Sequence, residues 1–79
     1  MTAPLGHGLV IGKFYPPHAG HHLLVRTAAR LAERVTVVVM AAHAERIPLE
    51  RRVAWMREAH ADDRNVTVTG IHDDIPIDY

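Results

Sequence analysis

A nearly unbroken run of apolar, mostly β-branched residues in the middle of the sequence, Val35–Met40, constrains the fold more than any other feature. Such a run is typical of a strand covered on both faces, as in a parallel sheet. Two further short runs that end in glycine, Gly8–Gly12 and Val66–Gly70, are also predicted to be strands. Because parallel strands need crossover connections, a helix is expected in each of the two gaps.

Apolar residues at helical spacing occur in both gaps. The first helix is predicted from Gly20 to about Arg34, and the second from Pro48, which suits a first helical turn, to about His60. The inward faces are predicted to consist of Leu24, Ala28 and Leu31 in the first helix and Leu49, Val53 and Met56 in the second. The order strand, helix, strand, helix, strand predicts an α/β fold with three parallel strands and right-handed crossovers.

Three strands laid in one direction across a sheet place both helices on the same face and leave the other face bare. A doubly wound sheet needs more strands than these and helices on both faces. We therefore expect residues 1–79 to be the N-terminal βαβαβ half of a larger domain. Residues 71–79 are expected to be irregular, because Pro76 forbids a helix there.

Composition narrows the class of protein. Lys and Arg number 9, and Asp and Glu also number 9, so the net charge is zero, which argues against a nucleic-acid or anionic-membrane binder. The sequence has no cysteine, which excludes disulfides and thiolate metal sites and favours a reducing compartment. No apolar run approaches the roughly 20 residues of a membrane span, and the start of the chain does not resemble a signal peptide. A cytoplasmic protein is expected.

The residues best suited to chemistry lie in Gly12–His21, which reads GKFYPPHAGH. This stretch lies where the carboxyl end of a strand meets the amino end of a helix, the place where open α/β sheets bind ligands. The free N–H groups of a helix N-terminus suit phosphate, and Gly20 lets the backbone come close to it. His18 and His21 can donate hydrogen bonds to phosphate oxygens, and Lys13 adds a positive charge.

Helical geometry separates the neighbouring histidines. With Leu24 at the centre of the buried face, His21 lies about 60° from it and His22 about 160°, at about 100° per residue. His21 is therefore expected to face the ligand and His22 to face solvent. A zinc module made of His18, His21 and His22 is disfavoured, because adjacent helical side chains diverge and zinc needs converging ligands. The remaining histidines are expected at the surface: His7, His43, His60 and His72.

The pattern G-x-F-x-P-x-H-x-G-H after a first strand resembles the signature of the HIGH-type nucleotidyltransferase superfamily. The chain is most similar to the nicotinamide-nucleotide adenylyltransferase domain of bifunctional proteins that also carry a ribosylnicotinamide kinase. This resemblance is carried by GLVIGKFYPPHAGHHLLV, ERIPLERRVAWM and DDIPIDY. It implies a Rossmann-like nucleotidyltransferase fold.

The resemblance also implies an activity. The phosphate of nicotinamide mononucleotide would attack the α-phosphorus of ATP, giving NAD and pyrophosphate, with positioning and charge stabilisation as the protein's main contributions. His18 and His21 would hold phosphate oxygens as catalytic residues, and Mg²⁺ would bridge oxygens of ATP. The alternatives are another adenylyl or cytidylyl transferase of the superfamily and a non-catalytic fragment.

Further binding residues follow from the same resemblance. Gly12 and Phe14, with Lys13 and Gly20, belong to the nucleotide-binding motif. Arg52 matches an arginine of the second helix and lies on the flank of its apolar face, where a salt bridge, for instance to Glu45 or Asp73, is the alternative interpretation. Trp55 lies on the same flank and can stack on a base or nicotinamide ring, with core packing as the alternative.

The sequence also departs from the family pattern. The second phosphate motif, a Ser/Thr-rich segment that ends in arginine, and the later strands do not occur in these 79 residues, and there is no kinase P-loop pattern. In the superfamily the first strand lies in the middle of the sheet. Gly8–Gly12 is therefore expected to be an exposed sheet edge in this chain, and we expect self-association through it.

Overall fold

The computed structural model describes residues 5–42 and 45–72, which form one three-stranded sheet and two helices. The elements are β1 (Leu5–Gly12), α1 (Ala19–Leu31), β2 (Ala32–Ala41), α2 (Leu49–Ala59) and β3 (Val66–His72). The strands lie in the order β1-β2-β3, and both pairs are parallel. The predicted α/β fold is confirmed. Neither described helix has the length and apolar character needed to cross a bilayer.

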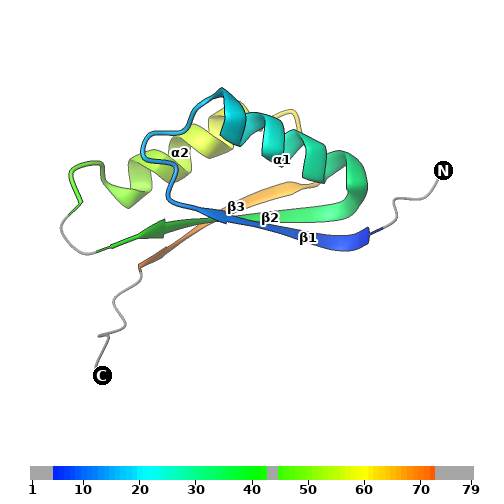
Figure 1. Ribbon diagram of the computed structural model, residues 1–79, viewed down its shortest axis with the longest axis horizontal. Coiled ribbons are helices and arrows are strands. Elements are labelled where there is room, and N and C mark those ends of the chain that lie inside the picture. Colours follow the sequence, from blue (N-terminus) through cyan, green and yellow to red (C-terminus); the bar gives the residue numbers. More distant parts are fainter. Residues whose placement is uncertain (1–4, 43–44, 73–79) are drawn as a thin grey trace, which may run out of the picture.

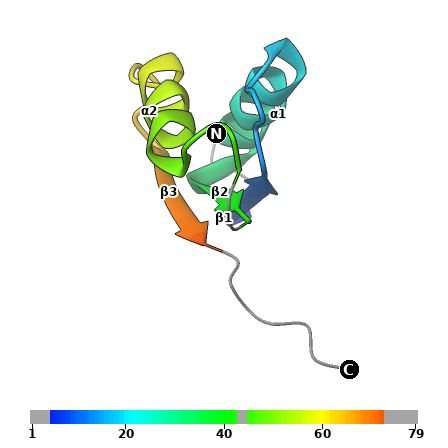
Figure 2. The same ribbon diagram turned by 90° about the vertical axis from the view of Figure 1, so that its left-hand side faces the viewer.

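Both helices lie on the same face of the sheet, as predicted (Figures 1 and 2). The core lies between them and the sheet. Its central row crosses all three strands, where Val10 pairs with Val37 and Val37 with Val68. Val25 of α1 and Met56 of α2 are fully buried and belong to the same cluster.

The predicted inward face of α1 is confirmed at Ala28, which packs partly buried against the core, but is wrong at Leu24 and Leu31. Val25 is completely buried, whereas Leu24 is 54% exposed and Leu31 is 47% exposed. One residue rotates a helical side chain by about 100°, so a stripe centred on Val25 turns Leu24 and Leu31 outward. Relative to Val25, His21 lies about 40° away on one side and His22 about 60° away on the other, so both face inward.

Several element boundaries also differ from the prediction. β2 begins at Ala32, directly after α1, so the helix is shorter than the predicted end at Arg34. Ala32 has extended backbone, is 4% exposed and pairs with Leu5, because strand pairing and burial outweigh its helix propensity. β1 begins at Leu5 rather than Gly8. β3 continues to His72, where Ile71 and His72 were predicted to be irregular.

The face of the sheet opposite the helices carries apolar side chains. Leu9 and Ile11 alternate with the inward Val10, and they are 62% and 55% exposed. Ile71 at the end of β3 is 47% exposed. Within the described residues β1 pairs only with β2, so β1 is a sheet edge, as predicted.

Candidate functional site

His18 and His21 cap the start of α1 reciprocally. His18 is the N-cap residue, and its Nδ1 accepts from the backbone N–H of Gly20 at 3.1 Å. The backbone N–H of His18 in turn donates to Nδ1 of His21 at 3.1 Å. The two rings are stacked with centroids 3.8 Å apart. The structure therefore brings the two predicted phosphate-binding histidines together at a helix N-terminus beyond the carboxyl end of β1.

This capping arrangement fixes the tautomer of both imidazoles. Because each Nδ1 accepts a backbone N–H, the proton of each neutral ring must lie on Nε2. Burial, and to a lesser degree the neighbouring His18, lowers the pKa of His21. Near neutral pH, His21 therefore presents an Nε2–H donor outside the cap, and the Nδ1 contact of His18 leaves its Nε2 as the second donor position.

Phe14 packs against the ring of His21. Its ring is 2% exposed and meets the ring of His21 edge-on, with centroids 4.8 Å apart. Its φ of 51° is in the left-handed region, which a bulky residue adopts only when its surroundings hold it there. A Cβ atom on residue 12 would lie 3.2 Å from Cζ of Phe14, so Gly12 leaves the room that the ring occupies. The G-x-F part of the motif thus shapes this loop.

Arg52 connects three segments around the site and is completely buried. Its guanidinium donates to the carbonyl of Lys13 at 2.9 Å and to the carbonyl of Met40 at 3.1 Å. It also forms an ion pair with Glu45 at 3.4 Å, one of the two partners that the salt-bridge interpretation named. The other, Asp73, lies outside the described residues. Its guanidinium carbon lies 5.0 Å from the centroid of the Tyr15 ring. Direct contact of Arg52 with a nucleotide stays a prediction.

Glu45 and Tyr15 are two organising residues that the sequence did not single out as site residues. Glu45 accepts from the backbone N–H of Ala42 and pairs with Lys13 at 3.3 Å. The hydrogen bond from Ala42 lowers the pKa of Glu45, and Lys13 and Arg52 lower it further. The Tyr15 hydroxyl accepts from the backbone N–H groups of residues 46 and 47, at 2.7 and 3.1 Å. The contacts of Glu45 with Lys13 and of Tyr15 with residues 46 and 47 join positions more than thirty apart, so no local pattern reveals them.

Trp55 lies beside the site and outside the core. It is 39% exposed and lines a hollow of about 320 Å³ with Pro16, Pro17 and His22. The core-packing interpretation of Trp55 is therefore wrong. Stacking of a ligand ring on Trp55 stays a prediction.

Two expectations about histidines are corrected. His22 is half-buried and is bonded to His60 at 2.9 Å, so it does not face solvent. His60 was expected at the surface but is 3% exposed, because it caps α2 and packs between His22 and Asp63. His7 and His72 are exposed, as predicted. His43 lies outside the described residues.

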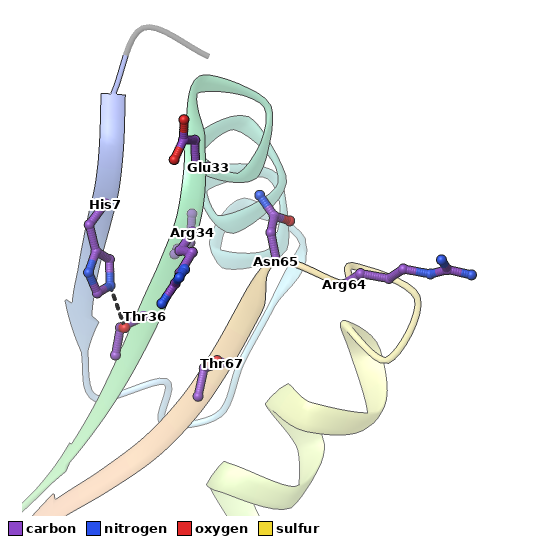
Figure 3. Close-up of a pocket in the computed structure, with 8 residues that line it drawn as sticks. His7, Glu33, Arg34, Thr36, Arg64, Asn65 and Thr67 are labelled. Carbon is purple, nitrogen blue, oxygen red and sulfur yellow. Dashed lines mark hydrogen bonds between the residues drawn. The ribbon is translucent and has the colours of Figure 1, made fainter. Parts of the chain in front are cut away.

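Another hollow, of about 440 Å³, lies elsewhere (Figure 3). It is at the amino ends of β2 and β3, away from the histidine pair that caps α1. Figure 3 shows the hydrogen bond between His7 and Thr36, 2.7 Å long, and Arg64 pointing away from the strands. The guanidinium groups of Arg34 and Arg64, which line this hollow, do not point toward a common position in it. This hollow is therefore not the candidate site.

Comparison with known proteins gives the family. Residues 9–73 match the family described as Cytidylyltransferase-like. The solved structure of NadR protein in complex with NR is 30% identical, with a TM-score of 0.81, over 98% of this chain and 23% of the NadR chain. NadR in complex with NAD and AMP-PNP is 31% identical, with a TM-score of 0.79, over 94% of this chain and 22% of the NadR chain.

The chain thus spans less than a quarter of the NadR chains that it matches. These similarities confirm the predicted resemblance to HIGH-type nucleotidyltransferases and to their nicotinamide-nucleotide branch. They also confirm the Rossmann-like βαβαβ fold. The chain belongs to the cytidylyltransferase-like family of nucleotidyltransferases.

Proposed function

We propose that this chain forms the triphosphate-binding part of a nucleotidyltransferase domain that transfers AMP from ATP to nicotinamide mononucleotide. The observation that carries the proposal is the reciprocal capping of His18 and His21, which occupies Nδ1 of each ring and leaves its Nε2–H as a donor. Two such donors at the positive end of a helix dipole suit the negative charge that builds on phosphate oxygens.

In the proposed reaction, a phosphate oxygen of nicotinamide mononucleotide attacks the α-phosphorus of ATP. The bond from that phosphorus to the oxygen bridging the α- and β-phosphates breaks, and pyrophosphate leaves, giving NAD. His18 and His21 stabilise the charge on the phosphoryl oxygens, and the Lys13 ammonium, which is more than half exposed, adds a positive charge nearby. Arg52 acts by holding the loop through the carbonyl of Lys13.

We propose that Mg²⁺ comes to the site with ATP, where it neutralises phosphate charge. The described residues hold no group of three or more His, Cys, Asp or Glu side chains placed to share a metal ion. Phosphate oxygens would therefore supply most of its ligands, in keeping with the preference of Mg²⁺ for oxygen. Because ATP and a reducing environment are both cytoplasmic, we propose that the protein works there.

The acceptor is proposed from the similarity to NadR, whose structures hold NR and NAD. Another adenylyl or cytidylyl transferase activity is the alternative within the family. A third possibility is that these 79 residues bind ATP without turnover, because the second phosphate motif does not occur in them.

Nuclear magnetic resonance of the ¹⁵N-labelled 79-residue chain tests the proposal. ATP with Mg²⁺ should shift the amide signals of Lys13, Gly20 and His21, and the variants His18→Ala and His21→Ala should abolish these shifts. His7→Ala serves as the matched control, because His7 lies on β1 far from the cap. If ATP leaves these amides unchanged in the folded wild-type chain, the proposed function is wrong.

Activity is measured separately, as NAD formed from ATP and nicotinamide mononucleotide. Where turnover is detectable, His18→Ala or His21→Ala should lower it by about 100-fold, the scale of losing one donor to the transition state. A loss below about threefold for both variants would contradict their role. Turnover with CTP in place of ATP would assign the chain to another branch, and binding without turnover would identify it as a non-catalytic fragment.

A further inference from the structure

A second pair of imidazoles, outside the phosphate-facing pair, joins the two helices. Nδ1 of His22, in the first turn of α1, is bonded to Nε2 of His60 at 2.9 Å. His60 caps the C-terminal end of α2, and its Nδ1 is bonded to Oδ2 of Asp63 at 2.7 Å. The three side chains form a continuous hydrogen-bonded arrangement, the Asp63–His60–His22 network.

The number of protons in this network decides whether it holds. An ionised Asp63 can only accept, so Nδ1 of His60 carries the proton that lies between them. In neutral His60, Nε2 then accepts from Nδ1–H of His22. If one extra proton makes one of the two imidazoles positive, the bond persists, because the charged ring donates and the neutral ring accepts. When both imidazoles are charged, two N–H groups face each other and the bond between His22 and His60 is lost.

The groups around His22 disfavour the charge that would break this bond. Burial lowers the pKa of His22 most, followed by His60 and then by the positive group of Arg26 on the next turn of α1. His21 and His18, on the same turn as His22, lower it further. On the other side of the network, the charged group that faces His60 is Asp63. The bond between His22 and His60 is therefore intact near neutral pH. The state in which both imidazoles are charged, which breaks this bond, forms only in acid.

The network lies where it can fix the phosphate-facing turn. Figure 2 shows that α1 and α2 lie side by side on the same face of the sheet. Among the side-chain hydrogen bonds between described residues, the one from His22 to His60 joins the start of α1 to the residue that caps α2. The backbone N–H of His22 also donates to the carbonyl of His18 at 3.2 Å. Moving His22 therefore moves the turn that carries His18 and His21.

We propose that His60 and Asp63 are positioning residues that act through His22. Their network holds the first turn of α1 against the end of α2, and its loss when both imidazoles are protonated loosens the turn that contacts phosphate. This inference rests on the proposed phosphate-binding role of His18 and His21. It makes the contact between His22 and His60 a pH-sensitive control on ligand affinity.

The network itself is tested without ligand. Imidazole ¹⁵N signals of the 79-residue chain, followed from about pH 8 to about pH 5, report the tautomer and protonation of each ring. His22 should carry its proton on Nδ1 near neutral pH, and the variant Asp63→Asn should change this tautomer population. A His22 signal that titrates identically in the wild-type chain and in His60→Gln would show that the two rings are not coupled.

Calorimetric affinity for ATP tests the positioning role. At about pH 7.5, His60→Leu should weaken ATP binding by about fivefold, the scale of one net hydrogen bond. At about pH 5.5 the difference from the wild-type chain should shrink, because the wild-type chain has then lost the bond as well. His60→Gln, a polar partner that does not titrate, should restore most of the affinity and remove this excess pH dependence. His7→Gln is the control and should behave as wild type at both pH values.

The outcomes separate the two proposals. Equal ATP affinity of wild type and folded His60→Leu at the higher pH overturns the positioning role. If His60→Leu does not fold, the same pH dependence of affinity in His60→Gln and wild type overturns it. A folded wild-type chain that binds no ATP overturns the proposed function, whereas the imidazole titration still shows whether the network exists.

Discussion

The imidazole of His18 lies so close to Gly20 that a Cβ atom on residue 20 would be 3.1 Å from Cε1 of the ring. The same ring accepts the N–H of Gly20. The glycine of the HxGH pattern therefore has a structural reason that is independent of any ligand, since it lets the N-cap imidazole lie flat against the helix.

Gly20→Ala should displace the His18 ring and weaken ATP binding while changing overall stability little. Alanine gains about 0.5–1 kcal/mol of helix propensity, and a disturbed N-cap loses about 1 kcal/mol, so the two effects nearly cancel. Gly6→Ala is the control, because nothing lies within 4 Å of a Cβ atom there. The measurements are urea unfolding and ATP affinity. Unchanged affinity in folded Gly20→Ala would contradict this account of the glycine.

Arg52→Lys should destabilise the fold by about 2 kcal/mol. A lysine has one ammonium nitrogen in place of the two that Arg52 directs at the carbonyls of Lys13 and Met40 and at Glu45, so it cannot match this geometry and buried acceptors lose a partner. Arg51→Lys, at the exposed neighbouring position, should stay within about 0.5 kcal/mol of wild type. Urea unfolding measures both. Similar stabilities of the two variants would show that the contacts of Arg52 contribute little.

Stability should fall with acid in two steps. The pKa values of His21 and His22 are lowered in the folded state, mainly by burial, so the unfolded state binds more protons just below the ordinary histidine pKa of about 6.5. Stability is full above that pH and decreases as the pH falls toward the folded-state values. The pKa of Glu45 is lowered as well, so its contribution is lost as the pH falls below the ordinary glutamate value of about 4.3.

Urea unfolding at a series of pH values measures these steps. His22→Gln should flatten the upper step, and Glu45→Gln should flatten the lower one. A free energy of unfolding that stays constant from about pH 7 to about pH 5 would contradict the histidine part of the prediction.

The features that the sequence predicted correctly are local ones. The valine-rich strand and the strand–loop–helix placement of the HxGH pattern depend on neighbouring residues, and both are confirmed. The inward face of α1 was mispredicted because Leu23, Leu24 and Val25 are consecutive apolar residues, which allow more than one stripe. Only packing against the sheet selects Val25.

The burial of His60 had no local signal at all. It follows alanine, glutamate and arginine in a polar stretch, and its partner His22 is 38 residues away. The same holds for Glu45, which meets Lys13 and Arg52 only after the two loops have come together. Contacts of this kind depend on the register of the whole sheet and on the tilt of both helices.

The edge formed by β1 leads to the last prediction. Within the described residues, the side of β1 away from β2 has no strand partner, and its N–H and C=O groups are a template for another chain. Leu24 and Leu31 of α1 line an open hollow of about 400 Å³ along this edge. Leu9 and Ile11 extend the apolar surface onto the bare face of the sheet. Apolar exposure of this kind favours association.

We therefore expect the purified 79-residue chain to be dimeric, aggregated or partly unfolded, and to turn over ATP poorly. Sedimentation velocity with far-ultraviolet circular dichroism measures both properties. Ile11→Lys should shift the distribution toward monomer, because a lysine on an edge strand opposes pairing with a further strand. Thr69→Lys, on the same face but on β3, should have a smaller effect, since it leaves β1 and its apolar neighbours unchanged. A compact, fully active monomer would show instead that β1 needs no further partner and that these residues do not behave as half of a domain.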